Sequence, residues 1–88
     1  MRLETVTIKD VKLAIAELTR TMRKQQSLSR SDLAEQLNLS RITIQNLETG
    51  QNVTIDTLLK VLQHFDLLNK FDDLLKNEMT DHSYKSLY

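Results

Sequence analysis

The sequence predicts an all-α fold of five helices, and three observations support this prediction. The 88 residues contain no proline and a single glycine, so little in the chain interrupts a helix. Serine and threonine residues that can cap a helix recur along the chain, each ahead of apolar residues spaced three and four positions apart. Clusters of β-branched residues are few after the first eight positions, which gives little support for strands.

Composition limits the class of protein. A chain of 88 residues with 40% apolar and 27% charged residues is typical of one soluble domain with one modest core. The absence of cysteine excludes disulfides, thiolate metal sites and cysteine nucleophiles. No apolar run reaches the length of a membrane span, and the N-terminus lacks the pattern of a secretory signal. We therefore expect a cytoplasmic protein with no membrane partner.

The charge is balanced overall but uneven along the chain. Twelve basic residues match twelve acidic ones, which predicts modest non-specific affinity for nucleic acid because phosphate contacts need lysine and arginine. Residues 20–46 nevertheless hold five basic side chains against two acidic ones: Arg20, Arg23, Lys24, Arg30 and Arg41 against Asp32 and Glu35. The central third of the chain is therefore expected to carry a positive local field.

The first helix is expected to begin near Ile8 and to end near Gln25. Thr7 and Asp10 have the spacing of a capping box, and residues 1–7 before it form an arm that is either extended or unstructured. An apolar stripe then runs along the helix through Ile8, Val11, Ile15, Leu18 and Met22. The last turn carries three basic side chains that we interpret as solvated charges near the helix dipole, with a phosphate contact from one or two of them as the alternative: Arg20, Arg23 and Lys24.

The central stretch predicts two short helices joined by a turn of three residues. Ser29 stands three positions before Asp32, and Ser40 precedes the run RITIQNLE, so each serine can cap a helix. Asn38 falls where the chain must leave the first of these helices, since asparagine tolerates the left-handed conformation well. Gly50, as the one glycine of the chain, is a stop signal after the second helix.

Apolar residues give these two short helices facing sides. The stripes are Leu33, Ala34 and Leu37 on the first helix, and Ile44 and Leu47 on the second. Ala34 is small where the two helices should cross, and Leu39 can plug the turn into the core. A plain helical hairpin would show a similar pattern, so this structural alternative stays open at this point.

The segments SRSDLAEQL, NLS and RITIQNLETG resemble, in this order, the second helix, the turn and the recognition helix of the lambda-repressor/Cro-like family, often called the XRE family. Glu48 and Gly50 stand at the matching closing positions. The resemblance covers most of the chain, from about Ile8 to Leu75. It departs from the family pattern at Gln26 and Asn38, where glycine is usual and where these residues can serve as caps.

The resemblance implies a compact five-helix, lambda-repressor-like DNA-binding domain. On this interpretation the chain divides into an N-terminal arm at 1–7, the DNA-binding domain at 8–76 with its helix-turn-helix at 30–49, and a tail at 77–88. The tail sequence NEMTDHSYKSLY is polar and lacks a clear period, which favours a frayed end; a docking segment is the alternative.

The fourth and fifth helices carry more apolar surface than a small monomer needs. Thr54 is expected to cap a helix with Ile55, Leu58, Leu59, Leu62 and Phe65 on one side and Val61 beside them, and Asp66 to end it. The next helix adds Leu67, Leu68, Phe71, Leu74 and Leu75. These leucine rows are either core or a self-association surface. The resemblance favours a homodimer, because the fifth helix of the family often forms the dimer contact, here through Leu68, Phe71, Leu74 and Leu75.

The helix 41–49 would lie in the major groove and read base edges with its outward side chains, as the resemblance implies. Arg41 suits guanine, and Gln45 or Asn46 suits adenine. Ile42 offers an apolar contact to a thymine methyl group. The resemblance places Arg30 beside Arg41, where it could brace that side chain or contact DNA. Candidate phosphate ligands are Ser29, Ser31, Thr43, Gln51 and Asn52.

Glu48 is the one acidic residue of this helix, and it would face phosphates if it pointed outward. We interpret it as one partner of an internal ion pair with Arg20 or Arg23. Its removal should then harm folding more than the choice of DNA sequence.

The sequence therefore favours a homodimeric transcriptional regulator, a repressor, that binds double-stranded DNA at a palindromic operator. An antitoxin that also binds a protein toxin is the main alternative, and an adaptor that binds only protein is a third. An enzyme is not expected, because Asp81, His82 and Ser83 are consecutive and His64 stands alone on a helix. No motif for a metal or a cofactor occurs, so none is expected.

Overall fold

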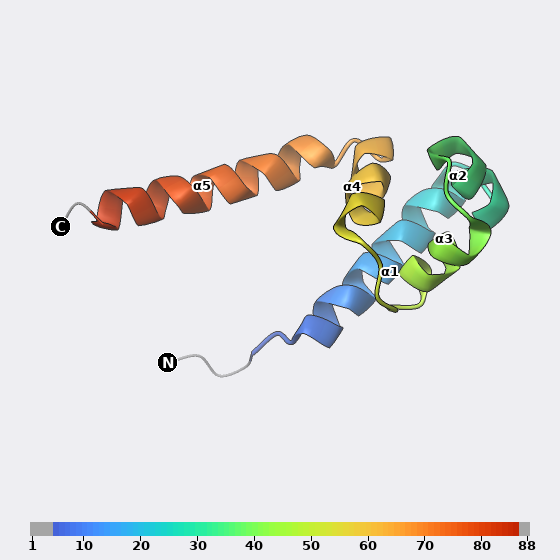
Figure 1. The fold of residues 1–88 in the computed structure, drawn as a ribbon, viewed down its shortest axis with the longest axis horizontal. Coiled ribbons are helices and arrows are strands. Elements are labelled where there is room, and N and C mark those ends of the chain that lie inside the picture. Colours follow the sequence, from blue (N-terminus) through green and yellow to red (C-terminus); the bar gives the residue numbers. More distant parts are fainter. Residues whose placement is uncertain (1–4, 87–88) are drawn as a thin grey trace.

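The computed structural model describes residues 5–86, with side chains described for residues 5–81, and this part of the chain is all-α (Figure 1). It holds five helices and no strand, as predicted. They are α1 (Ile8–Gln25), α2 (Arg30–Leu37), α3 (Arg41–Glu48), α4 (Ile55–His64) and α5 (Leu68–Ser86). Residues 5–7 are irregular, and the rest of the expected N-terminal arm, residues 1–4, lies outside the described residues.

The first four helices begin at the predicted caps, Thr7, Ser29, Ser40 and Thr54. Two of the caps are full capping boxes. The Thr7 hydroxyl accepts from the Asp10 backbone N–H at 3.0 Å, and the Thr7 N–H donates back to the Asp10 carboxylate. Ser29 and Asp32 repeat this exchange. The backbone bonds from Thr7 and Ser29 lower the pKa of Asp10 and of Asp32, so ionised carboxylates fix both helix starts.

The same four helices are each followed by a residue in the left-handed conformation: Ser27 (φ 59°), Asn38 (φ 57°), Gly50 (φ 77°) and Asp66 (φ 60°). This confirms the roles predicted for Asn38 and Gly50. After α1 the prediction was one residue early, because Gln26 keeps a negative φ and Ser27 makes the turn. At Gly50 the positive φ is the main reason for glycine, since a Cβ there would lie 2.9 Å from Leu13 Cδ2, the end of a flexible and exposed side chain that can move aside.

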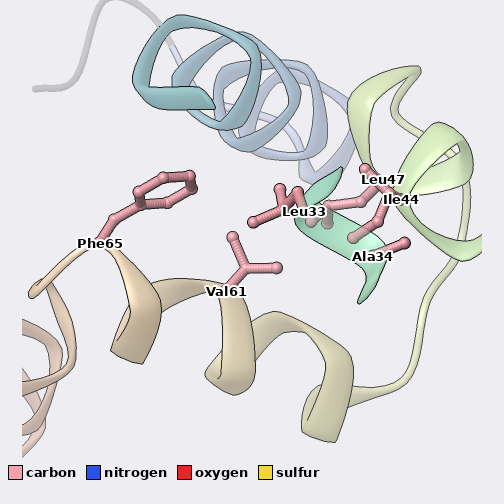
Figure 2. Packing of buried hydrophobic residues seen from close by; sticks show 6 residues of the cluster. All are labelled: Leu33, Ala34, Ile44, Leu47, Val61 and Phe65. Atoms are coloured by element: carbon pink, nitrogen blue, oxygen red, sulfur yellow. The ribbon is translucent and has the colours of Figure 1, made fainter. Parts of the chain in front are cut away.

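The core lies where α2 and α3 meet α1 and α4. Figure 2 shows its six buried hydrophobic residues, which come from α2, α3, α4 and the residue that follows α4, with Val61 extending toward Leu33: Leu33, Ala34, Ile44, Leu47, Val61 and Phe65. Leu37 and Leu39 pack against this cluster, as the sequence predicted, and Leu28 before α2 packs there too. Because Ala34 is small and only 3% exposed, α2 and α3 can approach closely.

The predicted apolar stripes of α1 and α4 were only partly right. On α1, Ile15 and Met22 pack against the core, but Ile8 is exposed, and Ala16, Thr19 and Arg23 are the buried residues. The Thr19 hydroxyl is satisfied by the Ile15 carbonyl at 2.8 Å. On α4 the buried residues are Thr57 and Val61, Phe65 is buried directly after the helix, and Ile55 is 71% exposed. Apolar spacing marks a helix face, but the short α2 and α3 cover only part of it.

α5 extends away from the other four helices (Figure 1). Its first turns contact α4, and the molecule reaches 51 Å along its longest axis. The radius of gyration is 15.7 Å, against about 12 Å for a compact domain of this length. The frayed tail predicted from residue 77 was wrong as far as Ser86, because α5 continues through these residues.

Candidate nucleic-acid interface

α3 separates its side chains into an inner and an outer set. Ile44, Leu47 and Glu48 are buried, with Ile44 and Glu48 0% exposed. These three residues share one face because they are three and four positions apart. Arg41 and Ile42 are exposed on the other side, and Gln45 and Asn46 are half-buried. The helix is thus fixed from within and presents a polar surface with one exposed apolar residue.

The outer side of α3 brings together two side chains that could read bases. The Arg41 Nη1 lies 3.4 Å from the Gln45 Oε1, one helical turn away. Ile42 is 58% exposed and belongs to no described hydrophobic cluster. Arginine, glutamine and an apolar contact are the side-chain types that distinguish guanine, adenine and thymine in the major groove.

Glu48 joins the end of α3 to α1 and to the start of α2. Its carboxylate accepts two bonds from Arg23, from Nε at 2.7 Å and from Nη2 at 2.9 Å, and one from the Arg30 Nε at 2.9 Å. Arg20 donates from Nη1 to the backbone carbonyl of Glu48, and the Arg23 Nη1 reaches the Leu28 carbonyl at 2.8 Å. The predicted internal pair with helix α1 is confirmed, and Arg30 is an additional partner.

This network is buried and fully bonded. The Arg23 side chain is 10% exposed and that of Glu48 is 0% exposed. Burial would raise the pKa of Glu48, but the bonds from Arg23 and Arg30 outweigh it and hold the pKa below its ordinary value. The same bond to Glu48 raises the pKa of Arg23. Within the described residues no buried side-chain nitrogen or oxygen lacks a hydrogen-bond partner.

The basic residues of the central stretch are less available than predicted. Arg23 was expected to be solvated but is buried in the ion pair, because the carboxylate of Glu48 replaces its water. Arg20 is directed to the end of α3. The Arg30 Nε bonds the Glu48 carboxylate, whereas the resemblance had implied a place beside Arg41. Of the five basic side chains, Lys24 and Arg41 stay exposed.

The candidate phosphate ligands lie at the two ends of α3. The Arg30–Glu48 bond brings the start of α2, with Ser29 and Ser31, next to the end of α3. Gln51 stands three positions after Glu48, and its backbone N–H donates to the Asn46 carbonyl at 2.9 Å. Thr43 is in the first turn of the helix, about 7.5 Å from Glu48 along its axis, with its Oγ1 2.8 Å from the Ser40 Oγ.

Lys12 is a residue that the sequence did not indicate. Its Nζ donates to the Asn52 side-chain oxygen and so ties α1 to the loop after α3. Leu13, its neighbour, covers Gly50 of the same loop. The two ends of this contact are 40 residues apart, and one lysine among several on a helix carries no signal of such a partner. α1 therefore helps to position the candidate phosphate ligand Asn52.

Other kinds of site find no support in the described part of the chain. No cluster of three or more histidine and carboxylate side chains there is placed to hold a metal ion. His64 is half-buried, with its Nε2 3.0 Å from the Gln26 Oε1 and its ring edge against Phe65, so it contributes to packing. The side chains of His82 and Ser83 lie outside the described residues. No described helix is long and apolar enough to cross a membrane.

Comparison with known proteins agrees with the geometry of α2 and α3. No curated protein matches the chain. A family sequence model described as helix-turn-helix matches residues 20–68, which is more than half of the chain and includes α2, its turn, α3 and α4. The chain therefore belongs to the lambda-repressor/Cro-like, or XRE, family of helix-turn-helix DNA-binding regulators.

Proposed function

We propose that this protein is a homodimeric transcriptional repressor that reads a palindromic operator with α3 in the major groove. The observation that supports this most directly is the division of α3 into a locked inner face and a free outer face. A recognition helix needs both, because the inner contacts fix the angle at which the outer side chains meet the bases.

We assign the base contacts to Arg41, Ile42, Gln45 and Asn46. Arg30 contributes from the start of α2, where Glu48 holds its Nε and 28% of its side chain stays exposed. Ser29, Ser31, Thr43, Gln51 and Asn52 bind phosphates around the two ends of α3. With Arg20, Arg23 and Arg30 directed toward Glu48, direct base contacts and dimerisation have to supply much of the affinity.

The dimer brings two α3 helices about 34 Å apart, one turn of DNA. We assign its contact to α5 through Leu68, Phe71, Leu74 and Leu75. This assignment is supported by exposure, since Leu74 is 55% and Leu75 is 49% exposed. Leucines that belonged to the core of the monomer would be covered.

In vitro selection from random duplex DNA by the purified protein tests this function, and two salt concentrations separate specific from phosphate-driven binding. We expect a palindrome with half-sites about ten base pairs apart. Arg41→Ala and Gln45→Ala should then each weaken operator binding by about 1 to 3 kcal/mol without changing the unfolding midpoint. Lys70→Ala, which removes an exposed charge on α5, is the matched control.

An antitoxin that binds both DNA and a protein toxin is the second candidate. The exposed apolar residues of α5 favour it, because they could cover a different protein in place of a second copy. Selection that enriches no sequence would reject the self-sufficient repressor. Alanine variants of Arg41 and Gln45 that keep full activity would favour an adaptor that binds only protein.

A further inference from the structure

α5 is longer than the part of the protein that supports it. Its 19 residues give a helix about 28 Å long, but α4 contacts only its first turns. From Asp72 to Asp81 every side chain is exposed, including Leu74, Leu75 and Met79. An isolated helical segment of about 12 residues is marginal in water. The distal half of α5 therefore needs contacts that a single copy of the chain does not provide.

A groove lies beside the base of this helix. It has a volume of about 360 Å³ and lies between α4 and α5, lined mainly by Ile55, Leu59, Leu68, Phe71 and Leu75. Ile55 at its rim is 71% exposed. The lining is largely apolar, and its position between two helices suits the apolar side of a third helix.

We propose that a second copy of this chain fills this groove with the distal half of its own α5, in a reciprocal exchange of helices. In this arrangement Leu75 and Met79 of each copy pack against Ile55 and Leu59 of the other. The inference rests on the homodimer proposed above and specifies which surfaces meet. It also couples association to folding, because the end of α5 becomes a stable helix when the partner covers it.

A second copy fits because one chain carries both halves of the contact. The exposed apolar side chains of α5 and the groove beside it belong to the same chain. In a dimer with a two-fold axis, each copy therefore inserts its α5 into the groove of the other, and both grooves are filled. Ile55, Leu74, Leu75 and Met79 are between 49% and 71% exposed, on the order of 100 Å² of surface each. With the half-buried groove residues, the two copies reach roughly the 1,200 Å² at which stable interfaces begin. A different partner would have to supply both a groove and a helix.

Met79→Lys tests the exchange without disturbing the monomer. Met79 is 60% exposed, and methionine and lysine have similar helix propensities. We expect the dimer dissociation constant, measured by analytical ultracentrifugation, to rise at least tenfold, with helical circular dichroism lower at equal concentration. Asn77→Lys adds the same charge on the opposite side of α5 and should leave both readouts unchanged. Equal dimerisation of wild type and Met79→Lys would overturn the inference.

A charge pair across the contact distinguishes this arrangement from other dimers. Ile55→Glu alone should weaken the dimer, and the double variant with Met79→Lys should restore it, because the new charges face each other between copies. If Ile55→Glu leaves the dimer intact while Met79→Lys dissolves it, α5 pairs with α5 and the exchange is wrong, although the homodimer stands. A wild-type chain that stays monomeric at every concentration overturns both the exchange and the homodimer. If that monomer binds a single half-site, DNA recognition does not depend on dimerisation.

Discussion

A comparison of α3 with α5 shows that a longer helix is not more firmly packed against the rest of the protein. α3 has 8 residues, and three of them are buried: Ile44, Leu47 and Glu48. α5 has 19 residues, and none of its described side chains is buried. The shorter helix is held on three sides, by the core, by Arg23 of α1 and by Arg30 of α2. Tertiary contacts rather than length or propensity therefore give a helix a fixed position.

The difference agrees with the two roles proposed above, base recognition by α3 and dimerisation through α5. A helix that reads bases must hold its angle to within a small error, so α3 is locked by a buried ion network. The proposed dimer contact needs apolar surface that the single chain leaves uncovered, and Leu74, Leu75 and Met79 of α5 are exposed. Three sets of measurements can break or sharpen this contrast, and a fourth tests the turn between α1 and α2.

Glu48→Gln is expected to have the largest effect. It leaves the buried Arg23 without an anionic partner, which should lower the free energy of unfolding by about 3 to 5 kcal/mol in urea denaturation. Lys76→Gln is the matched control on α5, where the ion pair with Asp72 at 3.0 Å is solvent-exposed. That variant should leave the unfolding midpoint unchanged. Equal losses in the two variants would mean that α3 is no more firmly held than α5.

The next largest difference is expected between truncations of apolar side chains on α3 and on α5. Ile44→Ala empties part of a fully buried site and should cost about 3 kcal/mol, within the usual range for isoleucine to alanine. Leu74→Ala on the exposed side of α5 should change stability by no more than about 0.5 kcal/mol in dilute protein. Thermal unfolding over a range of protein concentrations measures both, and the cost of Leu74→Ala should grow with protein concentration, as the proposed dimer requires.

Acid should weaken α3 through the same carboxylate. Because the pKa of Glu48 is lower in the folded chain than its ordinary value of 4.5, ionised Glu48 stabilises the fold above about pH 4.5. This contribution is lost as the pH falls through the lowered folded-state pKa. Asp10 and Asp32 at the capping boxes act in the same direction. The free energy of unfolding, measured by urea titration from pH 7 to pH 2, should fall more steeply with pH for wild type than for Glu48→Gln. Parallel curves would contradict this.

The smallest effect is expected at a helix end. Ser27 has a φ of 59°, which favours glycine, so Ser27→Gly should raise the free energy of unfolding by about 1 kcal/mol. Ser31→Gly makes the same chemical change inside α2 and should instead lower stability by about 0.5 to 1 kcal/mol. A loss at both positions in differential scanning calorimetry would contradict the left-handed turn after α1.

Local sequence signals predicted the parts of the fold that depend on neighbouring residues. Thr7, Ser29, Ser40 and Thr54 cap helices because each hydroxyl bonds a backbone N–H three positions ahead. Asn38 and Gly50 end α2 and α3 for an equally local reason, the ease with which they adopt a positive φ. These signals were sufficient to place the helix-turn-helix, and the match of the family model to residues 20–68 confirmed it.

Long-range contacts were predicted less well. The spacing of Ile8, Val11 and Leu18 suggested a continuous buried stripe on α1, but which turns are covered depends on where α2 and α3 end. The bond from Lys12 to Asn52 and the second partner of Glu48, Arg30, join residues 40 and 18 positions apart. Side chains that meet only after packing leave no period in the sequence. The roles of the individual DNA-facing residues stay predictions.

The sequence by itself determined five helices, four of their starting points, the turn between α2 and α3 and the family. These are set by bonds between residues three or four positions apart and by backbone preferences of single residues. The tertiary structure alone decided that Arg20, Arg23 and Arg30 turn toward Glu48, that α5 projects from the other helices, and that Leu74 and Leu75 stay uncovered. The direction of the arginines and the exposure of α5 both depend on which surfaces come together in space. A buried charge requires partners from other helices, and an apolar row stays exposed when no helix of its own chain reaches it.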